Sequence, residues 1–185
     1  MPELRRLETK RLVLRPLQLD DGATIARLAG DWRVAWPIPT IPHPYSLGRA
    51  RDFIRATRRG AAEGSEAVYA VTRKPEPALI GIISLRPQQG FIAETGYWMG
   101  VAYWGQGYMT EALRAIIRHA FCDLHLQRIF AWHIGRNPAS GRVMQKAGMR
   151  HEARLRQHVL HRGEVEDQVY YGLLRDEYLD ADAGC

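Results

Sequence analysis

The residues from Trp104 to Thr110 combine two glycines with the expected start of a helix. Their sequence, Trp104-Gly105-Gln106-Gly107-Tyr108-Met109-Thr110, follows a strand-like run from Glu94 to Val101 and precedes a helical pattern that continues to about Phe121. Glycines allow a tight turn and leave backbone N–H groups accessible to a ligand. The first turn of a helix adds unpaired N–H donors and a partial positive charge. The pattern therefore predicts an anion site, best suited to a phosphate or pyrophosphate group.

Two widespread phosphate-binding motifs do not fit this turn. No Gly-Lys-Ser/Thr follows it, so it is not a Walker A loop. A dinucleotide-binding fingerprint has three glycines and lies early in a parallel fold, whereas here two glycines follow apparently antiparallel strands. On these residues alone, a plain strand-to-helix turn remains the alternative.

A second informative stretch runs from Asn137 to Met149. Asn137-Pro138 predicts the start of a helix, because Asn is a strong N-cap residue and Pro suits the first helical position. Gly148 predicts the end of this helix.

The remaining pattern predicts one mixed α/β domain over residues 1–185, with antiparallel hairpins and one strand–helix–strand crossover at the glycine turn. Residues 32–45 hold four prolines and three aromatic residues, which predicts a loop. The acidic chain from Asp176 predicts a short tail, frayed from about residue 178. We expect strands over residues 11–17, 67–73, 79–85, 91–101, 127–134, 151–160 and 165–174, and helices over 20–29, 46–62, 108–121 and 137–148.

Composition limits the class of protein. The chain is 46% hydrophobic and 25% charged, with no apolar run long enough to span a membrane and no apolar N-terminal stretch typical of a signal peptide. Cys122 and Cys185 lie far apart in the sequence, which argues against a disulfide framework and favours a reducing cytoplasm. The net charge of +6 suits an anionic ligand, but the basic residues form no dense block, so nucleic acid is not an expected partner.

The order of elements and the two motifs resemble the GNAT superfamily of acetyl-CoA-dependent N-acetyltransferases. Within it, the chain resembles the RimJ/RimL-type branch, which includes ribosomal-protein N-terminal acetyltransferases. The resemblance covers essentially the whole chain and implies a mostly antiparallel twisted sheet of about seven strands, splayed between the fourth and fifth, with about four helices. The residues that carry it are 9–15, 94–99, 104–108, 110–113, 137–149 and 167–177.

The resemblance implies that acetyl-CoA is the cofactor and CoA the product. The strand residues Trp98, Met99, Gly100 and Val101 would pair with the pantetheine arm, with a backbone N–H near Met99 on the thioester oxygen. The pyrophosphate would be held by backbone N–H groups of Gly105, Gln106, Gly107, Tyr108, Met109 and Thr110. Trp104 and Trp98 would touch the cofactor or pack at its edge. Asn137 would bond the pantetheine amides besides capping its helix, and Arg142 would reach the 3′-phosphate or lie in solvent.

Two positions depart from the superfamily pattern. Met109 replaces a small residue in the pyrophosphate loop, so its side chain must point away from the phosphates or narrow the site. Met144 stands where many members have a tyrosine general acid, and it cannot donate a proton. Ser140, one helical turn earlier on the same face, is the alternative proton donor to the thiolate. Glu94 is the candidate base for the amine, unless it is only a solvent-facing strand residue.

The rigid aromatic loop and the last hairpin predict an acceptor-binding lip or, alternatively, a dimer contact. Its residues are Trp32, Trp36, Tyr45, Phe53, Tyr170 and Tyr171. We expect no metal, because the histidines lack ligand spacing. Three functions fit: direct acetyl transfer to a protein N-terminal α-amine, transfer to a small amine such as an antibiotic or polyamine, and a non-catalytic acyl-CoA-binding module. No acidic block surrounds the aromatic loop, which favours the first over a polycationic acceptor.

Overall fold

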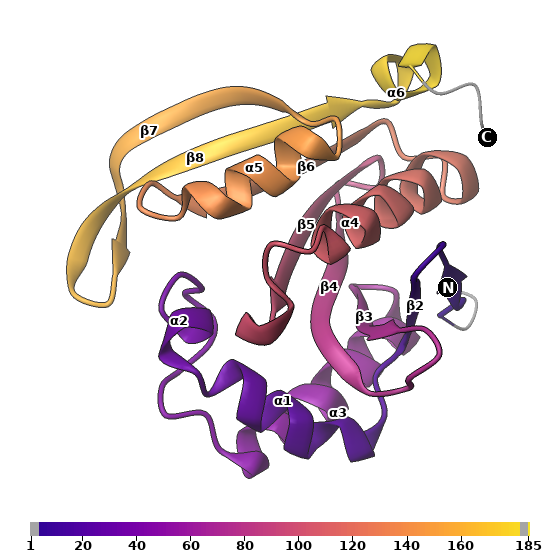
Figure 1. Cartoon of the computed structure of the whole chain (residues 1–185). Coiled ribbons are helices and arrows are strands. Elements are labelled where there is room, and N and C mark those ends of the chain that lie inside the picture. The colour runs from indigo at the N-terminus through magenta and orange to yellow at the C-terminus, as the bar shows by residue number, and fades with distance from the viewer. Residues whose placement is uncertain (1–3, 182–184) are drawn as a thin grey trace.

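A single sheet organises the chain (Figure 1). The computed structural model describes residues 4–181 and 185. Eight strands lie in the order β1-β2-β3-β4-β5-β6-β8-β7, and the pair β5–β6 is parallel whereas the others are antiparallel. The strands are β1 (Leu7–Glu8), β2 (Leu12–Pro16), β3 (Ala67–Arg73), β4 (Leu79–Gln88), β5 (Ile92–Met99), β6 (Arg128–Ile134), β7 (Arg150–His161) and β8 (Glu164–Leu174).

The parallel pair β5–β6 opens along its length. The two strands pair only from Ile92 opposite Arg128 to Glu94 opposite Phe130. Beyond Glu94, β5 stays paired with β4 as far as Met99, while β6 stays paired with β8 as far as Ile134. The sheet is therefore split into two halves from Glu94 onward. This confirms the predicted splay between the fourth and fifth strands, which are β5 and β6 here because the short β1 adds a strand.

Helices cover both faces of the sheet. The helices α1 (Gly22–Ala29), α2 (Trp32–Ala35) and α3 (Leu47–Glu63) pack on one face, and α4 (Tyr108–Arg118) and α5 (Pro138–Lys146) on the other. Alternation along β3 shows why: Val68 and Ala70 join the first layer, whereas Tyr69 and Val71 join the second. Figure 1 shows α4 and α5 side by side across the sheet, with α1 and α3 below them.

Two segments predicted to lack regular structure contain helices. The aromatic loop begins with a helical turn, α2, because Asp31 caps it by accepting a hydrogen bond from the backbone N–H of Arg33. The acidic tail is a helix, α6 (Arg175–Ala181), with Asp176 and Glu177 in its first turn, where negative charge is favourable. Residues 182–184 of the expected frayed tail lie outside the described residues. Within the described ranges no helix combines the length and apolar composition needed to cross a membrane.

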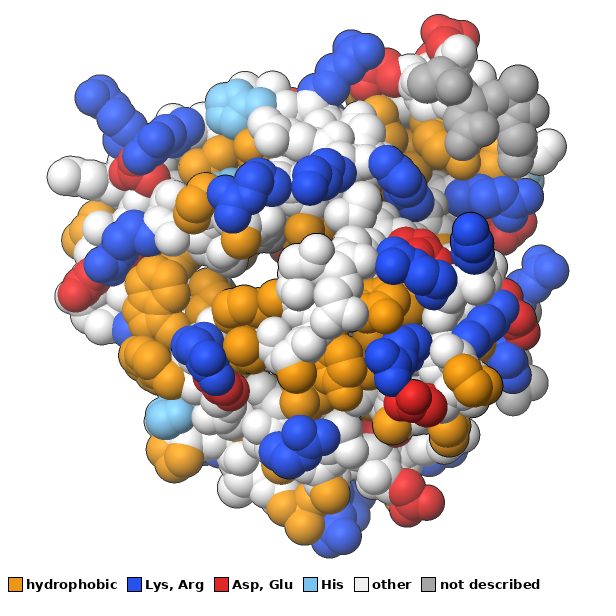
Figure 2. All heavy atoms as spheres, in the orientation of Figure 1, with side chains coloured by type: hydrophobic (Ala, Val, Ile, Leu, Met, Phe, Trp, Pro, Cys, Tyr) orange, Lys and Arg blue, Asp and Glu red, His pale blue; other side chains and the backbone are white. Residues whose placement is uncertain are grey.

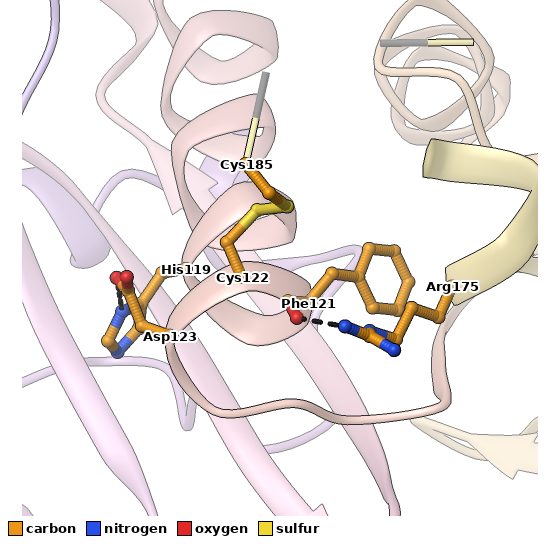
Figure 3. The surroundings of a disulfide bond; sticks show 6 residues. All are labelled: His119, Phe121, Cys122, Asp123, Arg175 and Cys185. Carbon is orange, nitrogen blue, oxygen red and sulfur yellow. Dashed lines mark hydrogen bonds and ion pairs between the residues drawn. A yellow bond between two sulfur atoms is a disulfide. The ribbon is translucent and has the colours of Figure 1, made fainter. Parts of the chain in front are cut away.

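Cys122 and Cys185 form a disulfide, so the expectation that they stay apart was wrong (Figure 3). They are 63 residues apart in sequence, yet their Cα atoms are 5.3 Å apart. The chain returns along β8, and Arg175 donates a hydrogen bond from its Nε to the Phe121 carbonyl at 3.3 Å (Figure 3). The large separation of the two cysteines in sequence therefore did not imply that they lie far apart in the folded chain. Since disulfides are typical of oxidising compartments, a cytoplasmic location stays a prediction that this bond does not favour.

Candidate active site

The glycine turn before α4 has the conformation that the sequence predicted. Gly105 and Gly107 have φ angles of +74° and +77°, in the left-handed region that glycine adopts readily. Gly107 is the N-cap of α4. Among the described residues, the backbone N–H groups of 105–107 find no acceptor, and the first turn of a helix leaves its own N–H groups without intrahelical acceptors. The turn therefore presents a run of backbone donors suited to an anion.

The segment before β2 braces the start of α4. Glu111, in the first turn of α4, accepts hydrogen bonds from Thr9 Oγ1 at 2.6 Å, the Arg11 backbone N–H at 2.8 Å and Arg11 Nε at 2.7 Å. Burial raises the pKa of Glu111, but these hydrogen bonds outweigh burial and lower it. Arg11 also donates to the Gln106 carbonyl at 3.0 Å and lies 4.6 Å from the centre of the Tyr108 ring. Sequence reasoning gave Arg11 and Glu111 no role, although both lie in stretches that carried the resemblance.

The Met109 side chain points into the core, away from the open backbone N–H groups of the turn. Its side chain is 7% exposed and packs in the core beneath α4, as does Tyr108. Of the two outcomes open for Met109, the structure therefore shows the one in which it points away. Trp104 is 48% exposed, and its Nε1 donates to the Met99 carbonyl at 2.7 Å. This bond fixes the turn against the end of β5.

The end of β5 borders the split in the sheet. Met99 pairs with Gly81 of β4, and the Gly100 N–H donates a hydrogen bond to the Ile80 carbonyl at 2.9 Å. Trp98 packs partly buried against the layer of α1 and α3, and Val101 begins a 3-10 turn. The opposite edge of β5, which would face β6, has no strand partner beyond Glu94. That edge is open to an extended ligand that pairs with backbone groups.

Glu94 lies at the apex of the split. Its Oε1 accepts a hydrogen bond from Trp132 Nε1 at 3.0 Å, its Oε2 accepts one from Gln88 Nε2 at 3.3 Å, and Arg86 Nη1 is 3.6 Å from Oε2. Tyr170 pairs with Trp132 across β6 and β8. Burial, with the nearby Glu94 charge, raises the pKa of Tyr170. Each carboxylate oxygen has two lone pairs, so these donors orient Glu94 and leave it lone pairs for a further hydrogen bond.

The hydroxyl groups of Ser140 and Tyr97 form a pair that the sequence analysis did not predict. Ser140 Oγ donates to Tyr97 Oη at 3.0 Å, and Tyr97 Oη donates to the Ser140 carbonyl at 2.9 Å. Burial raises the pKa of Tyr97 well above its usual range. The pair joins β5 to α5 across the split in the sheet. Tyr97 lies in a predicted strand, but its relation to Ser140 depends on a contact between residues 43 apart in sequence.

Asn137 occupies the N-cap position of α5 without capping it. Its side chain accepts no hydrogen bond from the helix, so the capping prediction was wrong. Its backbone has φ −111° and ψ 62°, unlike the extended backbone of Ser46 (φ −83°, ψ 161°), which does cap α3 as expected. Among the described residues the Asn137 amide has no hydrogen bond, and it remains available for a ligand.

The turn of the β7–β8 hairpin is fastened to the aromatic loop. Arg162 Nη2 donates to the carbonyls of Ala35 at 2.9 Å and Ile41 at 2.7 Å. His161 Nε2 contacts the Trp36 carbonyl at 2.5 Å. The Arg162 guanidinium also lies 4.9 Å from the ring centre of Trp32. Arg162 therefore joins the two segments expected to form the acceptor lip, and Figure 2 shows a hollow bordered by hydrophobic side chains on this side of the molecule.

Comparison with known proteins gives the family. Residues 11–150 match the model of the acetyltransferase (GNAT) domain. The chain belongs to the GNAT acetyltransferase family. It is therefore an N-acetyltransferase, and the splayed strands, the glycine turn and Glu94 all lie within the matched residues.

Three similar proteins illustrate the range of this family. The chain is 30% identical to an uncharacterized N-acetyltransferase, YnaD, of Bacillus subtilis (strain 168), over 93% of this chain and 98% of YnaD. It is 28% identical to the [ribosomal protein uS5]-alanine N-acetyltransferase of Escherichia coli (strain K12), over 94% of this chain and 92% of that enzyme. A solved structure of RimL, a ribosomal L7/L12 alpha-N-protein acetyltransferase in complex with coenzyme A, has a TM-score of 0.84 at 19% identity, over 94% and 99% of the two chains.

Not all predicted site residues of this GNAT domain lie together. Tyr45 and Phe53 pack partly buried against the core between α1, α3 and the sheet. Tyr171 is 6% exposed and lies under α5, on the opposite face from Tyr170, because successive strand residues point to opposite faces. The structure thus does not bring Tyr171 to the lip. Arg142 also lies away from the glycine turn, at a hollow between α5 and the β7–β8 hairpin.

Proposed function

We propose that this chain transfers an acetyl group from acetyl-CoA to a primary amine, with a protein N-terminal α-amine as the acceptor. The observation that carries the proposal is the split between β5 and β6 with the unpaired backbone donors of 105–107 beside it. Three functional groups border the same split: the Glu94 carboxylate and the paired hydroxyls of Tyr97 and Ser140. Acyl transfer from a thioester needs a held cofactor, a neutral amine and a proton for the departing thiolate.

The backbone of the turn and of β5 would bind the cofactor. The N–H groups from Gly105 to Thr110 would hold its pyrophosphate, and the open edge of β5 would pair with its pantetheine arm. The Asn137 amide, which has no partner in the described structure, would bond a pantetheine amide. The solved RimL complex contains coenzyme A on the same fold, which supports this cofactor.

The acceptor would approach from the face that carries Glu94. The amine nitrogen attacks the thioester carbonyl carbon, the C–S bond breaks, and the proton of the amine passes to Glu94 directly or through water. Trp132 and Gln88 hold the two carboxylate oxygens in place. An α-amine has a pKa near 8 against about 10.4 for lysine, so an α-amine needs less help from a base. Relatives named for acetylating ribosomal proteins support an N-terminal acceptor.

Ser140 would supply the proton to the thiolate of CoA. Met144 occupies the position where many superfamily members have a tyrosine general acid. Its side chain is 1% exposed and has no proton to donate. The Tyr97 hydroxyl, 3.0 Å from Ser140 Oγ, would orient that donor. Because burial raises the Tyr97 pKa, Tyr97 would position Ser140 rather than give up its own proton.

A thiol-release assay tests the proposal. Acetyl-CoA is offered with a peptide that has a free N-terminus, with the same peptide acetylated at its N-terminus and carrying an internal lysine, and with a polyamine. We expect release with the free N-terminus alone, and Ser140→Ala to lower kcat by about a hundredfold without raising KM for acetyl-CoA. Ser46→Ala, which removes a hydroxyl at the N-cap of α3, is the control. Release with the polyamine alone would favour the small-amine function, and an unchanged kcat in Ser140→Ala would remove Ser140 from the acid role.

A further inference from the structure

The helix α3 carries a row of arginines, Arg51, Arg55 and Arg59, which we call the arginine stripe. The three residues follow one another at intervals of four, so they lie on one side of the helix. All three are exposed, and the stripe faces away from the buried side of α3. The whole helix holds five arginines against Asp52 and Glu63, a net charge of +3 that is half of the +6 of the chain.

The arginine stripe gains little from the rest of the protein. Arg55 Nη1 is 3.0 Å from Asp52 Oδ1, whereas Arg51 and Arg59 have no acidic partner among the described residues. Like charges at intervals of four destabilise a helix, and an exposed ion pair contributes little to offset that. The stability of α3 therefore does not explain why three arginines stand in one row, and their charge is available to a partner.

The arginine stripe belongs to the layer that covers the Glu94 face of the sheet. Side chains alternate along β5, so Glu94 points to the same face as Trp98, which packs against the layer of α1 and α3. Arg86 Nη1 is 3.6 Å from Glu94 Oε2, and Arg86 Nη2 is 3.7 Å from Glu66 Oε2. A Cβ at Gly60, the residue that follows the stripe, would lie 2.9 Å from Glu66 Cγ. The C-terminal end of α3 is thus connected to the surroundings of Glu94 through two side chains.

We propose that the arginine stripe docks an acidic segment of the protein whose N-terminus is acetylated. This inference rests on the proposed function, because it adds a second contact to the acceptor that brings the amine. The carboxylates of Asp and Glu complement guanidinium groups in charge and geometry. The stripe extends about 12 Å along the helix axis, a length that an extended chain covers in about four residues. A short acidic run in the acceptor is therefore enough to span it.

Two features of α3 favour a protein over a nucleic acid as the partner. Asp52 is exposed beside the stripe. A peptide can place a neutral residue opposite this carboxylate, whereas a nucleic acid carries a phosphate at every nucleotide. Phe53 is the one aromatic residue of Leu47–Glu63, all of which the structure describes, and it packs partly buried against the core. The helix therefore offers no ring on which bases stack.

Peptide binding tests the docking surface without acetyl transfer. A fluorescent peptide with a blocked N-terminus and a run of Asp and Glu is titrated with the full chain, and a peptide with Asn and Gln in their place is the neutral reference. We expect saturable binding of the acidic peptide, measured by anisotropy, that weakens about 2- to 30-fold in the double variant Arg51→Gln/Arg59→Gln, because two exposed ion pairs are lost. Equal binding of the acidic and neutral peptides would overturn the proposal.

A second double variant controls for the total charge. Arg118→Gln/Lys146→Gln also removes two exposed positive charges, from α4 and α5 on the other face of the sheet, and should leave peptide binding nearly unchanged. Equal weakening in the two double variants would show general attraction to a basic protein and overturn the proposal. Tighter binding of a labelled single-stranded RNA of equal charge, lost in Arg51→Gln/Arg59→Gln, would assign the stripe to nucleic acid and overturn it as well.

Thiol release then relates the arginine stripe to catalysis. Two peptides with free, identical N-termini differ only in carrying an acidic or a neutral run farther along. We expect a lower KM for the acidic peptide, and we expect this difference to disappear in Arg51→Gln/Arg59→Gln and at high salt, which screens exposed charges. Equal KM values in the wild type would overturn the proposal. If neither peptide releases thiol while the blocked acidic peptide still binds at the stripe, the failure lies in the proposed function, and the docking surface is supported.

Discussion

Alanine at Gly107 would test whether the backbone of the glycine turn binds the cofactor. Gly107 has φ of +77°, and a Cβ there would meet only Arg11 Nη2, at an ordinary contact distance of 3.5 Å. The cost of alanine is therefore conformational: a left-handed conformation costs an L-residue about 1–2 kcal/mol. In the free protein the turn can relax part of this strain. Binding the pyrophosphate would have to restore the left-handed conformation, so the cost appears as lost affinity.

The expected loss follows from that energy. A cost of about 1–2 kcal/mol corresponds to about 5- to 30-fold weaker binding of acetyl-CoA. Gly105 has φ of +74° with nothing within 4 Å of a Cβ, so Gly105→Ala should weaken binding by a similar factor. Where the turn does not relax, the same energy instead lowers the melting temperature by about 2–8 °C. Calorimetric titration with acetyl-CoA, together with thermal unfolding, measures both effects.

Gly90 supplies a matched control. It has φ of +79° in the turn between β4 and β5, and nothing lies within 4 Å of a Cβ there. Gly90→Ala should therefore cost the same stability through the same strain while leaving acetyl-CoA affinity unchanged. If Gly107→Ala also kept wild-type affinity and lost only stability, the reasoning that places the pyrophosphate on this turn would be refuted.

Three further changes separate the roles of the site. Glu94→Gln should slow transfer mainly at low pH, where the amine is protonated and needs a base, and a pH–rate profile identical to wild type would dismiss Glu94 as the base. Arg162→Met removes the hydrogen bonds that fasten the hairpin to the aromatic loop. It should raise acceptor KM about 5- to 30-fold without changing KM for acetyl-CoA, and an unchanged acceptor KM would contradict this. Glu111→Gln should destabilise by about 1–2 kcal/mol at neutral pH. Because folding lowers the Glu111 pKa, that difference is present above the ordinary value of 4.5 and disappears as pH falls through the folded pKa; urea unfolding at several pH values measures it.

Most of the fold could be predicted because its elements carry local signals. The alternating run from Ala67 to Arg73 became β3 over the same residues. The N-cap Ser46 and the following apolar spacing gave α3, which begins at Leu47 as expected. What failed was the placement of segments far apart in sequence. The disulfide of Cys122 with Cys185 depends on α6 returning to the end of α4, and no local pattern encodes that return.

The candidate site divides in the same way. Backbone features that need particular residues, such as the left-handed glycines of the turn, were predictable from residue type. Side-chain partnerships were not: the support that Trp132 gives Glu94 joins residues 38 apart, and the pair of Tyr97 and Ser140 joins residues 43 apart. Tyr170 and Tyr171 were grouped because they are neighbours in sequence, although adjacent strand residues face opposite sides of a sheet.

The Tyr97–Ser140 pair would give a domain with methionine at position 144 a proton donor for the thiolate. Burial raises the Tyr97 pKa, so its hydroxyl stays protonated as pH rises through the ordinary tyrosine value of 10.0. Ser140 then keeps the same hydrogen-bond partner over that whole range. We therefore expect kcat to show no basic limb up to about pH 10, and Tyr97→Phe to lower kcat at every pH without changing the shape of the profile. A basic limb in the wild type that Tyr97→Phe abolishes would show instead that Tyr97 itself titrates during turnover, and the orienting role assigned to it would be lost.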